Sequence, residues 1–207
     1  METLDLHGKK TMIRLDLNVP LKDGNVTSDA RIQAALPTIQ MAIDKGAKVI
    51  LLSHLGRPDP DNLDGSFSLE PVAKKLQEIL NINVSFQPNW LDGIKEESQG
   101  IVLCENVRYE AGEKKNDESL SKQIADLCDV YVMDAFGASH REHSSTYGAL
   151  KYAKEGCIGP LLSKEVSSIR KAIDDPQAPV TAIIGGAKVS SKLGVIEKFS
   201  SFCDHVI

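Results

Sequence analysis

Short apolar runs alternate with amphipathic stretches along most of the chain. Strand patterns occupy residues 12–16, 48–53, 84–86, 101–104 and 130–134. The second run is apolar at most positions, which is expected of a strand that helices cover on both faces. Between the first two runs, apolar residues recur at helical spacing from Ile32 to Ile43. This alternation predicts an α/β fold with three layers, α/β/α, around a parallel, Rossmann-like sheet.

Two further helices are predicted after later strands. One covers Pro71 to Leu80, with Ser68 as its N-terminal cap, and the other covers Leu120 to Cys128. Serine is a favoured capping residue because its hydroxyl accepts a hydrogen bond from a free backbone amide of the first turn. No internal repeat or low-complexity segment interrupts this pattern. Residues 1–160 are therefore expected to form one domain.

The final part of the chain has a different pattern. A helix is expected from Leu161 to Ile173, followed by a proline-containing break, a strand from Val180 to Ile184 and a helix ending near Ser201. We interpret residues 161–179 as a hinge helix with its linker, and residues 180–207 as the start of a second domain. One strand and one helix cannot enclose a core of their own. Either this segment joins the first sheet, or the chain is a fragment of a longer, two-domain protein, and we favour the fragment.

The composition fits a globular chain and excludes some classes of partner. The 207 residues are 42% hydrophobic and carry a formal net charge of -5. This charge argues against a general attraction to nucleic acid or to an anionic membrane surface. No apolar run approaches the ~20 residues of a membrane-spanning helix, and the N-terminus lacks a secretory signal, so a cytoplasmic location is expected. The four cysteines are scattered without a CxxC motif and are expected to be reduced thiols.

Polar and basic residues accompany the ends of four predicted strands. They are Asp16 and Asn18 at the first strand, His54 and Arg57 after the second, Arg108 after the fourth, and Arg141 after the fifth. In an open parallel sheet, ligands bind outside the carboxyl ends of the strands, so these residues are expected to converge on one crevice. Planar guanidinium groups hold phosphate or carboxylate by paired hydrogen bonds. The sequence therefore predicts a site for a small, negatively charged ligand.

These candidate residues also have structural interpretations. A single arginine can be an ordinary surface or ion-pair residue, and His54 can be a buried histidine with satisfied hydrogen bonds. We interpret Asp134, at the end of its strand, as a loop brace in preference to a reacting group. His140 and His143, with Asp134 and Cys104, suggest a metal site as an alternative. Zinc sites need three or four converging ligands, and this set is incomplete.

Five motifs occur in order along the chain and together carry a family resemblance. They are residues 14–20 (RLDLNVP), 53–58 (SHLGRP), 105–108 (ENVR), 134–141 (DAFGASHR) and 185–192 (GGAKVSSK). In these motifs the chain resembles the phosphoglycerate kinase family, and the match covers the N-terminal half of such proteins. The resemblance implies an N-terminal domain that binds 3-phosphoglycerate, a C-terminal domain that binds the adenine nucleotide, and a hinge helix between them.

Carried onto this chain residue by residue, the resemblance implies a substrate site and a nucleotide site. The residues implied for 3-phosphoglycerate are Asp16, Leu17, Asn18, Arg31, His54, Leu55, Gly56, Arg57, Arg108 and Arg141. Those implied for the nucleotide are Gly185, Gly186, Ala187, Lys188 and Lys192. Asp16 is a poor direct partner for an anion, so we expect it to position a neighbouring arginine. The glycines would let backbone amides approach a phosphate at the start of the next helix.

The reaction implied by the resemblance is reversible phosphoryl transfer between ATP and the carboxylate of 3-phosphoglycerate, a step of glycolysis that gives 1,3-bisphosphoglycerate and ADP. Because a carboxylate is already a nucleophile, catalysis would require alignment and charge neutralisation more than a general base. Arg31 and Lys192 are implied as the catalytic residues. Mg²⁺ is implied as the partner of ATP or ADP, with its protein ligand outside these 207 residues.

Other functional interpretations stay open at this point. The chain alone is expected to bind substrate without catalysing transfer, because the implied adenine pocket lies outside it. Alternatively, the same strand-end geometry could belong to a non-catalytic anion-binding module or to another α/β enzyme acting on phosphorylated acids. The intact protein is expected to be a monomer. Residues 180–207 alone would expose a strand edge and favour some self-association.

Overall fold

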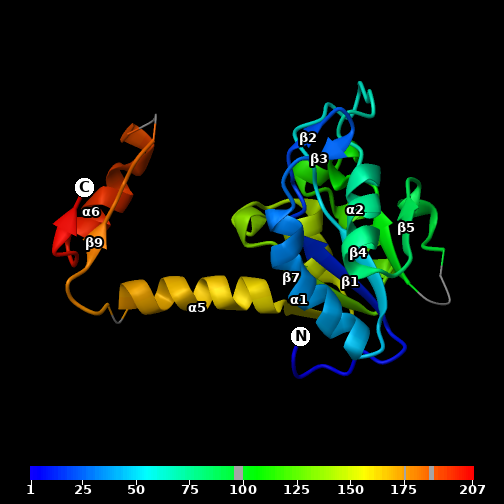
Figure 1. The fold of residues 1–207 in the computed structure, drawn as a ribbon, viewed down its shortest axis with the longest axis horizontal. Coiled ribbons are helices and arrows are strands. Elements are labelled where there is room, and N and C mark those ends of the chain that lie inside the picture. Colours follow the sequence, from blue (N-terminus) through cyan, green and yellow to red (C-terminus); the bar gives the residue numbers. More distant parts are fainter. Residues whose placement is uncertain (96–99, 175, 187–188) are drawn as a thin grey trace. The chain divides into compact units, whose positions relative to one another are not determined.

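The chain forms two compact units, Met1–Lys164 and Glu165–Ile207. A six-stranded parallel sheet lies at the centre of the first unit. The computed structural model describes the whole chain except residues 96–99, 175 and 187–188. The strands of the sheet are β1 (Lys10–Leu15), β4 (Lys48–Leu52), β5 (Val84–Gln87), β6 (Ile101–Cys104), β7 (Val130–Asp134) and β8 (Glu155–Ile158). Their spatial order is β5-β6-β4-β1-β7-β8, and every neighbouring pair is parallel (Figure 1). The predicted α/β fold is confirmed.

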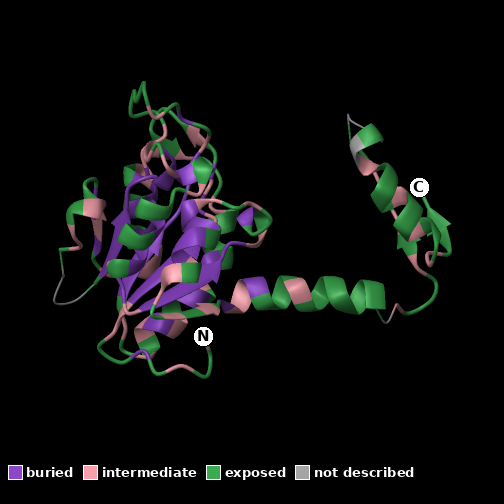
Figure 2. Ribbon diagram, turned by 180° about the vertical axis from the view of Figure 1, so that it is seen from behind, coloured by how far each residue is buried: buried purple, intermediate pink, exposed green. Residues whose placement is uncertain are grey.

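Helices pack on both faces of this sheet and complete the predicted three layers. They are α1 (Ala30–Asp44), α2 (Glu70–Leu80), α3 (Glu118–Asp126) and α4 (Ala149–Tyr152). Successive strand residues point to opposite faces, so Ile13 packs in the apolar layer of α1 and α2, whereas Met12 packs in that of α3 and α4. Figure 2 shows the buried strands between helices whose outer sides are exposed.

Besides α4 and several short helices, the sequence predictions miss β8 and a small hairpin of the first unit. β8 escaped prediction because its residues alternate between half-buried and exposed and include Gly156, as suits an edge strand. The other element is an antiparallel hairpin of β2 (Leu21–Lys22) and β3 (Asn25–Val26). Its turn residues, Asp23 and Gly24, have φ values of 50° and 73°, as in a two-residue hairpin turn.

The start of α2 differs from the predicted cap at Ser68. The residue that precedes the helix is Leu69, whose backbone N–H donates to Glu105 Oε1 at 2.9 Å. The Ser68 hydroxyl accepts from the N–H of Glu70 at 3.2 Å and donates to Glu105 Oε2 at 2.8 Å. The predicted cap position was therefore wrong by one residue. The reason is that Glu105, which follows β6, reaches the helix terminus from a distant part of the sequence.

The second unit begins within α5 (Pro160–Asp174) and contains one parallel pair of strands. β9 (Thr181–Ala182) pairs with β10 (His205–Val206), and α6 (Leu193–Ser200) lies between them in sequence. β9 is shorter than the strand predicted for residues 180–184. The division into domains at residues 160 and 179 stays a prediction. None of the helices in the described part of the chain is long and apolar enough to cross a membrane.

Candidate functional site

Hydrogen bonds tie together the loops that follow β1, β4 and β6. The Ser53 hydroxyl accepts from the N–H of Leu17 at 2.9 Å, and the Ser53 carbonyl accepts from the N–H of Val107 at 3.1 Å. Asn18 Oδ1 accepts from the N–H of Gly56 at 2.8 Å. Three strand ends that are far apart in sequence therefore meet at the carboxyl edge of the sheet, which is the arrangement predicted for a strand-end site.

Asp16 and Arg31 form an ion pair at this edge. Asp16 directly follows β1, and Arg31 lies in the first turn of α1. One guanidinium nitrogen contacts both carboxylate oxygens at 2.7 Å, and the Arg31 side chain remains 49% exposed. The carboxylate thus orients a cation that still faces solvent. This geometry supports the positioning role predicted for Asp16.

Gly56 and Arg108 link the loop after β4 to the loop after β6. Gly56 has a φ of 59°, and a Cβ atom there would overlap the ring of Phe67, so glycine suits the position on both counts. The Gly56 carbonyl accepts a hydrogen bond from Arg108, whose side chain is buried. Arg108 Nε has no hydrogen-bond partner within the described residues. A buried donor left without an acceptor is costly, which favours a ligand that supplies one.

Burial and nearby arginines set the charge states of Arg108 and His54. Burial, followed by the charges of Arg141 and Arg14, lowers the pKa of Arg108 to about 10. Burial also lowers the pKa of His54 to about 2, and four arginines act in the same direction: Arg14, Arg108, Arg141 and Arg31. His54 is therefore neutral at physiological pH. These four arginines all act on His54, so they form one group of positive charge. We call the four residues, together with Arg57, the arginine cluster.

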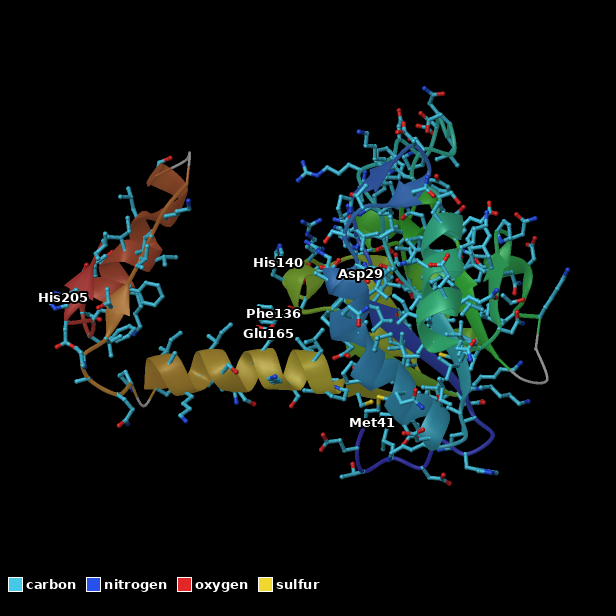
Figure 3. All side chains as sticks on the ribbon, in the orientation of Figure 1. Asp29, Met41, Phe136, His140, Glu165 and His205 are labelled. Atoms are coloured by element: carbon cyan, nitrogen blue, oxygen red, sulfur yellow. The ribbon has the colours of Figure 1, made fainter. Side chains whose placement is uncertain are left out.

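Arg57 and Arg141 add less constrained cations to this cluster. Arg57 is exposed, and its side chain makes no hydrogen bond or ion pair with another described residue. Arg141 is half-buried, with its Nε 3.4 Å from Nε2 of His140, which Figure 3 marks. Burial lowers the pKa of Arg14, and the carboxylates of Glu113 and Asp16 partly oppose this shift. The site therefore keeps an excess of positive charge for an anionic ligand.

Leu17 and Leu55, also predicted as substrate-site residues, are buried, with 0% and 2% of their surface exposed, and their contact with substrate stays a prediction. Their backbone N–H groups donate to the Ser53 hydroxyl and to Asn106 Oδ1. Neither leucine offers a free N–H or an accessible side chain to a ligand. The structure places both as anchors that hold the site loops against the core.

Several buried polar residues that build the site are missing from the sequence predictions. Asn106 accepts from the N–H groups of Leu55 and Arg108 and donates to two loop carbonyls, at 2.7 and 2.9 Å. Arg14 is 1% exposed in the central strand. The sequence did mark Arg14 as unusual, because it is a charged residue within an apolar strand. Glu113 has no comparable local signal, since its bonding partner lies 32 residues away.

The residues predicted for the nucleotide fall in the second unit. Gly186 has a φ of 128°. Lys192, the last residue of the short helix η6 (Val189–Lys192), donates a hydrogen bond to the carbonyl of Gly185. Ala187 and Lys188 lie outside the described residues. Gly185, Gly186 and Lys192 are thus neighbours before α6, and their contact with a nucleotide stays a prediction.

The side chains considered for a metal site have other surroundings. Asp134 accepts from the N–H of Leu162 at 2.8 Å and from a threonine hydroxyl, which supports its interpretation as a brace. Cys104 is buried in the apolar core. His143 Nδ1 lies 3.7 Å from Glu113 Oε1. Across residues 1–95, 100–174, 176–186 and 189–207, no three His, Cys, Asp or Glu side chains form a group that could hold a metal ion.

The parallel sheet and the arginine cluster at the carboxyl edge of its strands define an α/β domain of the kind in which ligands bind at that edge. Comparison with known families makes this more specific. The family model for phosphoglycerate kinase matches residues 1–207, and the chain belongs to the phosphoglycerate kinase family. This membership does not favour the alternative of an unrelated anion-binding module.

Individual relatives agree with this assignment. Phosphoglycerate kinase of Francisella tularensis subsp. novicida is 53% identical over 196 residues, which are 95% of this chain and 50% of the relative. That of Nitratidesulfovibrio vulgaris is 51% identical over the full chain and 53% of the relative. The solved phosphoglycerate kinases from Coxiella burnetii and Pyrococcus horikoshii match with TM-scores of 0.91 and 0.87, at 48% and 32% identity; the chain covers 53% and 54% of them. The chain thus spans about half the length of the curated relatives it matches.

Proposed function

We propose that the arginine cluster binds 3-phosphoglycerate, as the substrate half of a phosphoglycerate kinase. The observation that carries this proposal is the convergence of several arginines around the neutral ring of His54. A phosphate group bears roughly -1.5 to -2 charges near neutral pH, and the substrate carboxylate adds another. Guanidinium groups suit that load because each can hold two oxygens of a phosphate or carboxylate at once.

The whole protein would transfer a phosphoryl group between ATP and the substrate carboxylate. That carboxylate is ionised at neutral pH, so the reaction depends on in-line alignment and on neutralising the charge of the phosphoryl oxygens in transit. Arg31 would supply a cation on the substrate side, where its ion pair with Asp16 holds it oriented. Lys192 would do so on the nucleotide side, next to the backbone amides of Gly185 and Gly186.

Magnesium would arrive with ATP or ADP. The described side chains do not provide three clustered acidic, histidine or cysteine ligands for it. We propose, from the family resemblance, that the ion is held by the nucleotide phosphates and by a protein ligand outside these residues. Ala187 and Lys188 would join the nucleotide site. We place the protein in the cytoplasm, as a monomer that acts in glycolysis.

Calorimetric titration of 3-phosphoglycerate into the chain at low salt tests the proposal. The expected result is saturable one-to-one binding that an Arg31→Ala, Arg57→Ala double variant loses. The matched control is Arg170→Ala, which removes an exposed arginine of α5 outside the cluster and should leave binding unchanged. An absence of binding in the folded chain, or an equal loss in the control, would contradict the proposed substrate site.

A further inference from the structure

A chain of hydrogen bonds runs behind the arginine cluster from Glu113 to His54. Glu113 begins the short helix η3 (Glu113–Lys115) and is 1% exposed. Its Oε1 accepts from the Ser145 hydroxyl at 2.6 Å, and its Oε2 accepts from the Ser145 backbone N–H at 2.9 Å. Ser145 Oγ accepts from Arg14 Nε at 2.9 Å, and a terminal nitrogen of Arg14 lies 3.1 Å from His54 Nδ1.

The donors and acceptors along this chain have fixed directions. An ionised carboxylate is an acceptor only, so Glu113 requires the Ser145 hydroxyl to donate its hydrogen towards it. The hydroxyl lone pairs are then left for Arg14 Nε. The Ser145 carbonyl is also engaged, by the hydroxyl of Tyr131, so Ser145 has little freedom to turn. Glu113 is therefore the terminal acceptor that orients Ser145 and, through it, the guanidinium of Arg14.

The hydrogen bond from Arg14 determines which ring nitrogen of His54 carries the proton. A guanidinium has five N–H donors and no acceptor, so His54 Nδ1 must accept from Arg14 and carry no hydrogen. A neutral imidazole then carries its hydrogen on Nε2. His54 Nε2 makes no hydrogen bond with another described residue. The ring thus presents a free N–H donor next to the arginine cluster.

We propose that Glu113 is a positioning residue of the anion site, which acts through Ser145 and Arg14 to hold His54 as a neutral Nε2–H donor for a ligand oxygen. Cationic groups face His54 from β1 (Arg14), α1 (Arg31), η2 (Val107–Tyr109, Arg108) and the loop after β7 (Arg141). A further positive charge among them would be repelled. A neutral N–H still bonds to an anion and avoids that repulsion.

The ring protonation can be measured directly by two-bond ¹H–¹⁵N correlation spectroscopy on the histidine-labelled chain between pH 5 and 8. The His54 signals are assigned by their loss in a His54→Gln variant. The expected pattern has a protonated Nε2 and an unprotonated Nδ1 throughout this pH range. A ring protonated on Nδ1, or an imidazolium that titrates within the range, would overturn the proposal. No ligand is needed for this measurement.

A Glu113→Gln variant tests the positioning role. The amide has nearly the same shape but only one acceptor oxygen and no charge, so one of the two Ser145 donors loses its partner. We expect the single Nε2–H pattern to be lost, with the Nδ1–H form appearing. Glu110→Gln is the matched control, because Glu110 is in the same loop and its side chain makes no hydrogen bond within the described residues. An unchanged His54 pattern in Glu113→Gln would overturn the role.

Ser145→Ala covers the case in which Glu113→Gln does not fold. It keeps both Glu113 and Arg14 and removes the hydroxyl that joins them, so the same change at His54 is expected. A folded Ser145→Ala variant with the wild-type His54 pattern would overturn the proposal. A purely structural role for Glu113 would lower stability but would leave the His54 proton on Nε2 in any variant that folds.

The ligand-binding part of the proposal rests on the proposed substrate site, and a second readout separates the two. In the calorimetric titration, Glu113→Gln should weaken 3-phosphoglycerate binding about tenfold, as expected for a lost charge-assisted hydrogen bond, and Glu110→Gln should not. If the wild type binds and both variants bind equally well, the positioning role fails while the proposed function stands. If the wild type does not bind but His54 shows the Nε2–H pattern, the proposed function fails while the hydrogen-bond chain is supported.

Discussion

Asn106 exchanges two hydrogen bonds with the backbone of Leu55, its Nδ2 donating to the Leu55 carbonyl at 2.7 Å and its Oδ1 accepting from the Leu55 N–H at 3.2 Å. The side chain therefore pairs with the loop after β4 much as a strand residue pairs with its neighbour. Asn106 is fully buried. The position of the site loop depends on this pairing, because Leu55 immediately precedes Gly56 and Arg57.

Replacement of Asn106 by alanine should therefore be strongly destabilising. It would leave buried backbone donors and acceptors of the site loop without partners, at a cost of about 3 kcal/mol in the free energy of unfolding. Urea unfolding followed by circular dichroism measures this change. Asn62→Ala is the control, since Asn62 is exposed and should shift stability by less than about 0.5 kcal/mol. A loss as small as that of the control would contradict the role of Asn106.

Gly56→Ala should disturb the site more than an equivalent change elsewhere. The added Cβ meets the ring of Phe67 and also sits at a φ of 59°. Gly8 has a φ of 70° with nothing within 4 Å of an added Cβ, so Gly8→Ala carries the backbone strain without the overlap. We expect Gly56→Ala to lose about 1–3 kcal/mol more stability than Gly8→Ala. It should also weaken 3-phosphoglycerate binding, whereas equal effects in the two variants would exclude the overlap as a cause.

The buried His54 and the half-buried His143 should make the chain less stable in mild acid. Burial lowers the pKa of His54 to about 2 and that of His143 to about 4. Between pH 6.5 and pH 5, both side chains therefore stay neutral in the folded state, whereas they become protonated in the unfolded state. The unfolded state binds more protons below pH 6.5, hence stability falls as the pH falls. His54 should account for about 2 kcal/mol of this loss between pH 7 and pH 5, and the partly exposed His143 for less.

A comparison of variants isolates the contribution of His54 from that of the acidic residues. The loss of unfolding free energy between pH 7 and pH 5 should be about 2 kcal/mol smaller in His54→Gln than in the wild type. His205→Gln, at an exposed position of β10, serves as the control and should follow the wild type. A pH dependence that is the same in all three proteins would show that His54 is not held neutral.

A polypeptide of these 207 residues should bind 3-phosphoglycerate without turning it over. Transfer requires a bound nucleotide in line with the substrate, and the chain spans only about half the length of its relatives. A coupled assay for ADP formation checks this expectation, with a full-length relative as the positive control. Turnover at about 1–100 s⁻¹, the range typical of kinases, would contradict it.

The sequence predicted the bounds of an element correctly where the residues of that element alone determine its structure. β6 and β7 have the predicted bounds, because buried strands of a parallel sheet are apolar at consecutive positions. β8 lacked such a pattern. The cap of α2 was misplaced because Glu105, a residue after β6, supplies the acceptor. Local sequence carries no information about a partner that arrives from another strand.

In the candidate site, too, some residues could be predicted from the sequence and others could not. Arg108 and Arg141 could be proposed because each follows a predicted strand, and Arg31 because of the family resemblance. The structure brings all three to one cluster around His54. Glu113 could not be proposed from sequence, because Ser145, its partner, is 32 residues away on another loop. The supporting residues of the site become visible only when the chain is folded.

Arg14 also has a consequence for how the sheet assembles. Its neighbours Ile13 and Leu15 lie in the leucine-rich layer beneath α1 and α2, whereas its own side chain reaches Ser145 on the opposite face. A shift of β1 by one residue against β4 and β7 would turn the guanidinium into that apolar layer, away from every partner it has. A buried arginine in the central strand thus penalises misaligned pairing, so the side chain that contacts His54 also selects the correct strand alignment during folding.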